Sequence, residues 1–181
     1  YTDLTIKQKT IRDALVLLLA FTHHADGKPD NSRLLCATED ATKISGKRYS
    51  CERATFLVHD GGWSFGAGIE LSTNTFNAKM HRDFWLRYPV FKNKRCKLNV
   101  RNIWKSDFQN IEISENGRAF LASLLDKLSI KQIRDLFKAS RVDLRDHVLY
   151  KMDLKESINL WTDAFIQRRK EISEARCPNK L

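Results

Sequence analysis

The first long run of apolar residues lies near the start of the chain and predicts a buried helix from Ile6 to about His23. Its apolar positions recur at intervals of three and four residues, which is the spacing of one face of an α-helix. They are Ile11, Ala14, Leu15, Leu18 and Leu19. Further apolar residues stand between these positions, so we expect the helix to be deeply buried.

The middle of the chain has only short apolar runs separated by polar, glycine-containing stretches. Residues 33–37 and 55–59 are predicted as two short strands, with a polar, charged loop over residues 38–50 between them. Residues 63–79 are rich in Gly, Ser, Asn and Thr and are expected to be irregular. A short helix is predicted over residues 80–88, and the proline that follows directly would end it.

The C-terminal third shows three helical patterns with recognisable starts. Ser114 can cap the first of them, and Ser129 with Gln132 has the spacing of a capping box for the second. A third helix is expected from Leu154 to about Arg176. No internal repeat or linker is visible. The sequence therefore predicts a single, mainly α domain over residues 1–181, of α+β class, with a short β element that carries loops.

Composition and charge narrow the range of partners. The 181 residues are 42% hydrophobic and 30% charged, which is typical of a globular protein. The longest apolar run has eight residues, too short for a membrane span. The net charge of +10 favours an anionic partner. The basic residues are dispersed and the four tryptophans are expected in the core or lining a pocket, so a basic nucleic-acid-binding domain is kept only as an alternative.

The four cysteines allow three pairings, and the sequence does not choose among them. A disulfide between Cys36 and Cys51 could close the polar loop, and one between Cys96 and Cys177 could tie the C-terminus to the body. Two disulfides would indicate an oxidising compartment, hence a secreted or periplasmic protein. Four reduced thiols are the alternative. A zinc site that adds histidines to Cys36 and Cys51 is disfavoured by irregular spacing.

The candidate chemistry begins directly after the first helix, in the run His-Ala-Asp-Gly-Lys-Pro-Asp-Asn at residues 24–31. This run resembles the catalytic loop of protein kinases, His-Arg-Asp-Leu-Lys-Pro-Glu-Asn. The resemblance implies that Asp26 is the base for the attacking hydroxyl, Lys28 a contact to the transferred phosphate and Asn31 a metal ligand. The family's arginine is replaced here by Ala25.

A second motif follows the second predicted strand, where Asp60-x-Gly62 is followed by Phe65 and Gly66. This arrangement is similar to the atypical secretory-pathway kinases of the four-jointed type. The resemblance implies that Asp60 binds the metal bridging the nucleotide phosphates, with Gly62 beside the nucleotide. The implied cofactor is ATP with Mg²⁺ or Mn²⁺, and the implied fold is the helical large lobe of a kinase.

The sequence thus predicts an atypical kinase-like phosphotransferase domain, or the large lobe of one. Nothing before Asp26 can supply a small lobe, so we expect a second chain or a missing N-terminal lobe to complete the site. The alternative is a non-catalytic secreted or periplasmic binding protein on the same scaffold. The long interval between Asn31 and Asp60 requires an inserted loop, whose Lys43, Lys47 and Arg48 either contact phosphate or an acidic substrate or are simply solvated.

Overall fold

The protein is mainly helical in the computed structural model, as its periodicity predicts. The structure describes residues 6–24, 32–46, 48–51, 53, 55–58, 64–65, 78–99 and 111–178. These residues form six α-helices: α1 (Ile6–Phe21), α2 (Ala78–Arg87), α3 (Glu115–Leu125), α4 (Ile130–Ala139), α5 (Val142–Tyr150) and α6 (Leu154–Glu174). The mainly α, α+β class is confirmed.

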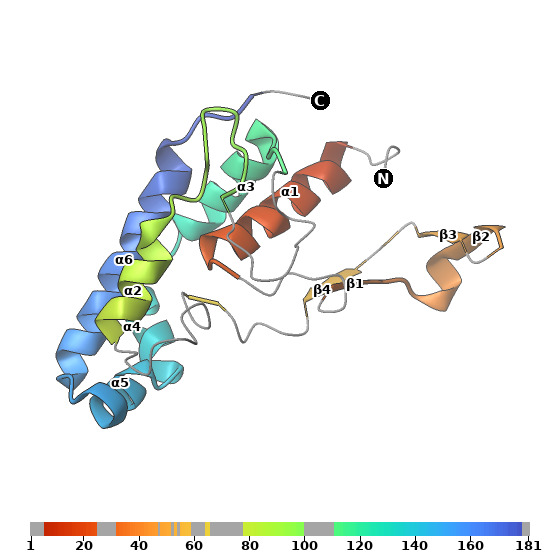
Figure 1. Cartoon of the computed structure of the whole chain (residues 1–181). Coiled ribbons are helices and arrows are strands. Elements are labelled where there is room, and N and C mark those ends of the chain that lie inside the picture. The colour runs from red at the N-terminus through yellow and green to blue at the C-terminus, as the bar shows by residue number, and fades with distance from the viewer. Residues whose placement is uncertain are drawn as a thin grey trace.

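Four short strands form two separate antiparallel pairs. β1 (Ser32–Leu35) pairs with β4 (Thr55–Val58), and between them β2 (Ala41–Ser45) pairs with β3 (Arg48–Cys51). A 3₁₀ turn, η2 (Thr38–Asp40), precedes β2. The prediction of a loop over residues 38–50 was therefore wrong. Figure 1 shows the β2–β3 hairpin projecting away from the helices, with β1 and β4 between it and the helical body.

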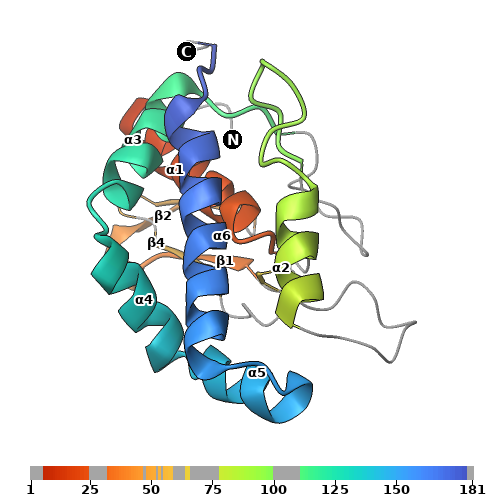
Figure 2. The ribbon, with the colours of Figure 1, turned by 90° about the vertical axis from the view of Figure 1, so that its left-hand side faces the viewer.

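The longest helix, α6, forms the centre of the helical body. It contacts α2, α3, α4 and α5, and Figure 2 shows it running between α4 on one side and α2 on the other. Its inward stripe recurs at helical spacing and includes Ile158, Trp161, Phe165 and Ile172, each at most 4% exposed. The helix predicted from Leu154 to about Arg176 is thus confirmed as α6.

An aromatic cluster fills the core where α1, α2, α4 and α6 meet. The Phe165 ring lies 4.9 Å from Phe21, and Trp85 stacks on Trp161 at 6.2 Å. The Trp85 indole N–H also donates to the carbonyl of Phe21 at 2.7 Å, so its polar atom is satisfied. The expectation of buried tryptophans is confirmed for these two, whereas Trp63 and Trp104 lie outside the described residues.

Helix starts follow the predicted capping pattern in two cases. Ser114 accepts from the backbone N–H of Gly117 at the start of α3, and Ser129 with Gln132 forms a complete capping box for α4. Helix α5 has no such signal. It begins after Arg141, which has a left-handed backbone (φ 59°) and no side-chain cap, so the sequence pattern missed it.

Helices α1 and α3 approach each other closely because Gly117 has no side chain. A Cβ atom at this position would collide with the Cβ of Asp13 and lie 3.2 Å from the backbone nitrogen of Ala14. The buried Asp13 carboxylate accepts from the backbone N–H and the hydroxyl of Ser114, at 3.0 and 2.6 Å. This contact turns one face of α1 inward and leaves the predicted face residue Ile11 49% exposed.

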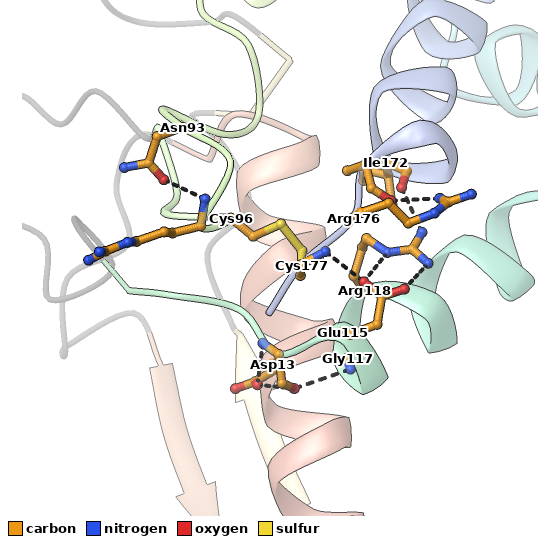
Figure 3. The surroundings of a disulfide bond; sticks show 12 residues. Asp13, Asn93, Cys96, Glu115, Gly117, Arg118, Ile172, Arg176 and Cys177 are labelled. Atoms are coloured by element: carbon orange, nitrogen blue, oxygen red, sulfur yellow. Dashed lines mark hydrogen bonds and ion pairs between the residues drawn. A yellow bond between two sulfur atoms is a disulfide. The ribbon is translucent and has the colours of Figure 1, made fainter. Parts of the chain in front are cut away.

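The C-terminal segment is fixed to the body by a disulfide and a partly buried ion pair (Figure 3). Cys96 is bonded to Cys177. The Glu115 carboxylate pairs with the buried Arg118 and also accepts from the backbone N–H of Cys177 at 2.8 Å. The hydrogen bond from Arg118 lowers the pKa of Glu115, with burial opposing it.

The second disulfide joins Cys36 to Cys51 and closes the base of the β2–β3 hairpin. All four cysteines are therefore paired. Of the three possible pairings, the structure has the one in which one disulfide closes the polar loop and the other ties the C-terminus to the body. Because both thiols of Cys36 and Cys51 are consumed, neither is available to hold zinc. Two disulfides are compatible with a secreted or extracellular protein.

Candidate functional site

The five predicted site residues lie outside the described residues. They are Asp26, Lys28, Asn31, Asp60 and Gly62. They belong to two segments, residues 25–31 and residues 59–63, which we call the first and second site segments. The structure does describe the residue on each side of both segments, and these four flanking positions define how the two segments are held.

The strand pair β1–β4 holds the end of the first site segment beside the start of the second. Ser32, the first residue of β1, is the antiparallel partner of Val58, the last residue of β4. The chain leaves the first site segment at Ser32 and reaches the second at Val58. The two segments therefore meet the sheet at directly paired positions.

Hydrogen bonds hold the start of the first site segment beside the end of the second. The Nδ1 atom of His24, just before the first segment, lies 3.2 Å from the hydroxyl oxygen of Ser64, just after the second. The backbone N–H of Phe65 donates to the carbonyl of Thr22 at 2.6 Å. Both segments are consequently bounded at both ends by residues that contact each other.

The end of α1 positions His24 for this contact. His23 takes a left-handed backbone conformation (φ 50°), which ends the helix, and its ring packs between Phe84 and Tyr88. The backbone N–H of His24 donates to the carbonyl of Leu19 at 2.8 Å, and its side chain is only 2% exposed. Because it is buried and bonded on both backbone and ring, His24 is a fixed starting point for the first site segment.

Phe65 anchors the far end of the second site segment in the aromatic core. Its ring lies 5.0 Å from Trp85 and 6.1 Å from Phe137, with edge-to-face geometry in both cases. Sequence reasoning placed Phe65 in a motif but missed this anchoring role and the contact made by Ser64. Neither follows from hydrophobic periodicity, since the partners are 20 or more positions away in the chain.

A buried arginine and its partly exposed glutamate partner hold α2, which carries the Phe65 partner Trp85. Arg168 on α6 is 1% exposed, pairs with Glu171 and donates to the carbonyl of Tyr88 at the end of α2. Glu171 in turn accepts from the backbone N–H of Val90 at 2.9 Å. Burial lowers the pKa of Arg168, and the neighbouring Glu171 carboxylate opposes this shift.

The inserted hairpin leaves the sheet at the end opposite to the site segments. The last pair of the β1–β4 ladder is Leu35 with Thr55, and the disulfide between Cys36 and Cys51 follows it. Lys43 is exposed on this hairpin, which Figure 1 shows pointing away from the helices. This placement favours the solvated alternative for Lys43, while the side chains of Lys47 and Arg48 are outside the described part.

The described residues contain neither a metal-binding cluster nor a membrane-spanning helix. Across the described ranges, no three His, Cys, Asp or Glu side chains gather in a way that could hold a metal ion. Among the helices described, none is long and apolar enough to cross a membrane.

Comparison with known proteins leaves the site to be interpreted from its own residues. No family model matches the chain, and neither a curated protein nor a solved structure does.

Proposed function

We propose that the protein is an atypical kinase-like phosphotransferase domain, or the large lobe of one, that transfers the γ-phosphate of ATP with the help of Mg²⁺ or Mn²⁺. Asp26 acts as the base for the acceptor hydroxyl and Lys28 contacts the transferred phosphate. Asn31 and Asp60 hold the metal, with Gly62 beside the nucleotide. A second chain or an N-terminal lobe completes the nucleotide site.

The observation that carries this proposal is the double pairing of the two site segments. Consecutive Cα atoms are only 3.8 Å apart, and antiparallel partners lie about 4.5–5.5 Å apart. Asn31 directly precedes Ser32, and Asp60 follows Val58 by two residues. A site in which both residues bind one metal requires their segments to start from neighbouring positions, and the pairing of Ser32 with Val58 meets this requirement.

The second pairing supports the same arrangement from the other side. Asp26 follows His24 by two residues, and His24 contacts Ser64, which ends the second site segment. A base and metal ligands must lie close together to act on one phosphoryl group. Two short segments that begin and end beside paired residues suit this requirement, which supports the proposal.

The residue types suit this chemistry. Carboxylate and amide oxygens are the ligands that Mg²⁺ and Mn²⁺ prefer, which fits Asp60 and Asn31. The metal, when bound, would neutralise charge on the nucleotide phosphates. Asp26 would accept the proton of the attacking hydroxyl while Lys28 stabilises the charge on the moving phosphoryl group.

The test is calorimetric titration of the purified chain with ATP, in the presence and absence of Mn²⁺. We expect binding that requires the metal and is lost in Asp60→Ala. The matched control is Asp135→Ala, which removes an exposed carboxylate of α4 that pairs with Lys131 and leaves the site segments untouched. Binding that survives Asp60→Ala would contradict the assigned metal site.

A second variant separates binding from catalysis. Asp26→Asn should keep metal-dependent ATP binding but lose phosphoryl transfer, because only the proton acceptor is removed. If the folded wild-type chain binds no nucleotide at all, the non-catalytic alternative on the same scaffold would replace this proposal.

A further inference from the structure

A tight loop after α2 carries four basic residues within six positions. They are Lys92, Lys94, Arg95 and Lys97, and we call residues 91–98 the basic loop. The first three are exposed and Lys97 is half-buried. The loop lies outside both site segments, and the proposed phosphotransfer does not use it.

The basic loop has a defined backbone conformation. Phe91 and Leu98 are bridged as antiparallel partners, and the N–H of Lys92 donates to the carbonyl of Lys97 at 2.7 Å. At the tip, the N–H of Cys96 donates to the carbonyl of Asn93 at 3.1 Å, which closes a four-residue turn. Lys94 and Arg95 occupy the two central positions of that turn.

The loop is also anchored firmly to the helical body. Cys96 is bonded to Cys177, and Figure 3 shows this disulfide joining the loop to the segment after α6. The N–H of Leu98 donates to the carbonyl of Ile111 at 2.9 Å, and Lys97 is bridged to Glu112. A rigid loop loses little conformational entropy when a partner binds it.

The backbone holds the cations of the loop close together. The N–H of Lys92 donates to the carbonyl of Lys97, and Lys94 and Arg95 lie between these two residues at the exposed turn. An acidic group that contacts the turn would therefore meet several positive charges over a short stretch of chain.

We propose that the basic loop is a docking site for an acidic segment of a partner protein. The arginine fork of Arg95 matches a carboxylate, and the neighbouring lysines supply further positive charge around one turn. A short acidic peptide can follow such a small, curved patch.

The shape of the loop disfavours other anionic macromolecules. Nucleic-acid surfaces combine a long basic groove with exposed aromatic rings, whereas the aromatic residue of this loop, Phe91, packs against the core. Membrane-surface binding combines cations with apolar side chains that enter the lipid. The exposed positions 92–95 of the loop carry no apolar side chain.

The experiment measures binding of a fluorescent oligoglutamate peptide by anisotropy at low and high salt. The wild-type chain should bind it, and Lys94→Glu with Arg95→Glu should weaken binding about tenfold or more. Added salt should weaken the wild-type interaction as well. Both substitutions replace exposed side chains at the turn, whose hydrogen bonds use backbone atoms and Asn93, so the fold should be kept.

The matched control has the same change in net charge at a different place. Lys127→Glu with Lys155→Glu alters exposed lysines after α3 and in α6 and should leave peptide binding unchanged. Equal weakening by both double variants would overturn the proposal, because it would reflect total charge alone. So would preferential binding of a single-stranded oligonucleotide or of anionic phospholipid vesicles, or no binding of the peptide at all.

Discussion

The helical body and the strand arm, residues 32–58, are held by different forces. In the body, α1 and α6 bury continuous apolar stripes, and side chains such as Leu17 and Ile172 are fully buried. In the arm, the exposed fractions of Leu35, Ile44 and Leu57 range from 41 to 61%. Two-stranded ribbons are marginally stable in water, so the arm depends on its ladder hydrogen bonds and its disulfide. Along the chain, the first site segment connects α1 to β1 and the second follows β4.

The largest effect should come from removing a core aromatic of the body. Trp161→Ala deletes a ring that stacks on Trp85 and an indole N–H that donates to the buried Asp146 at 2.9 Å. We expect the free energy of unfolding to fall by about 3–5 kcal/mol, measured by urea denaturation followed by far-UV circular dichroism. Phe120→Ala, at a position 42% exposed, should cost far less. Similar losses would mean that the assigned core is wrong.

The two disulfides test whether arm and body unfold together. Replacing Cys96 and Cys177 by serine opens a loop of 81 residues and should lower the stability of the helices by about 2–5 kcal/mol. The same replacement of Cys36 and Cys51 should leave the helical transition almost unchanged, because that bond lies within the arm. An equal drop for both pairs would show that the regions form one cooperative unit.

A smaller effect is expected at the contact between α1 and α3. Gly117→Ala would normally favour a helix, but here the added methyl group meets Asp13, so we expect a loss of about 1–3 kcal/mol in thermal or urea unfolding. The comparison is Gly46→Ala in the arm, where nothing lies within 4 Å and only the left-handed backbone (φ +52°) opposes the change. That variant should leave helix unfolding unchanged. Stabilisation by Gly117→Ala would refute the close contact.

The smallest effect concerns stability in acid, at the contact between Glu115 and the C-terminal segment. The pKa of Glu115 is lowered in the folded state, chiefly by its hydrogen bond with Arg118. Its contribution is therefore present above the ordinary glutamate pKa and is lost as pH falls through the lower folded value. Glu115→Gln should remove this part of the acid dependence, about 1 kcal/mol or less since solvent reaches the carboxylate. If the free energy of unfolding, measured by urea titration at several acidic pH values, falls equally in the variant and the wild type, this role of Glu115 is contradicted.

The elements that the sequence predicted well are those with strong local signals. Each of these elements combines helical periodicity with a second signal. For α3 and α4 this signal is a capping residue, and for α1 and α6 it is the length of the pattern. The hairpin at residues 41–51 was missed because the side chains of β2 are exposed or half-buried on both faces, so no alternating pattern marks this strand. Its one local hint is the turn at Gly46.

The candidate site could be predicted only as two motifs in sequence. What joins them is tertiary: His24 with Ser64, and Ser32 with Val58. These pairs are 40 and 26 positions apart in the chain, respectively, and no periodic pattern connects them. The burial of Phe65 against Trp85 is likewise a consequence of how α2 packs on the body. The roles of Asp26, Lys28, Asn31, Asp60 and Gly62 remain proposals for the experiments above.

The position of the β2–β3 hairpin makes it a natural place to graft foreign sequence. It departs from the β1–β4 ladder after Leu35 and returns before Thr55, at the end away from the site segments. The entropy of closing a loop grows only slowly with its length, so extra residues at the tip would cost little. A peptide tag or dye inserted beside Gly46 would thus lie at the outer end of the arm. The ladder between Ser32 and Val58 would keep its register.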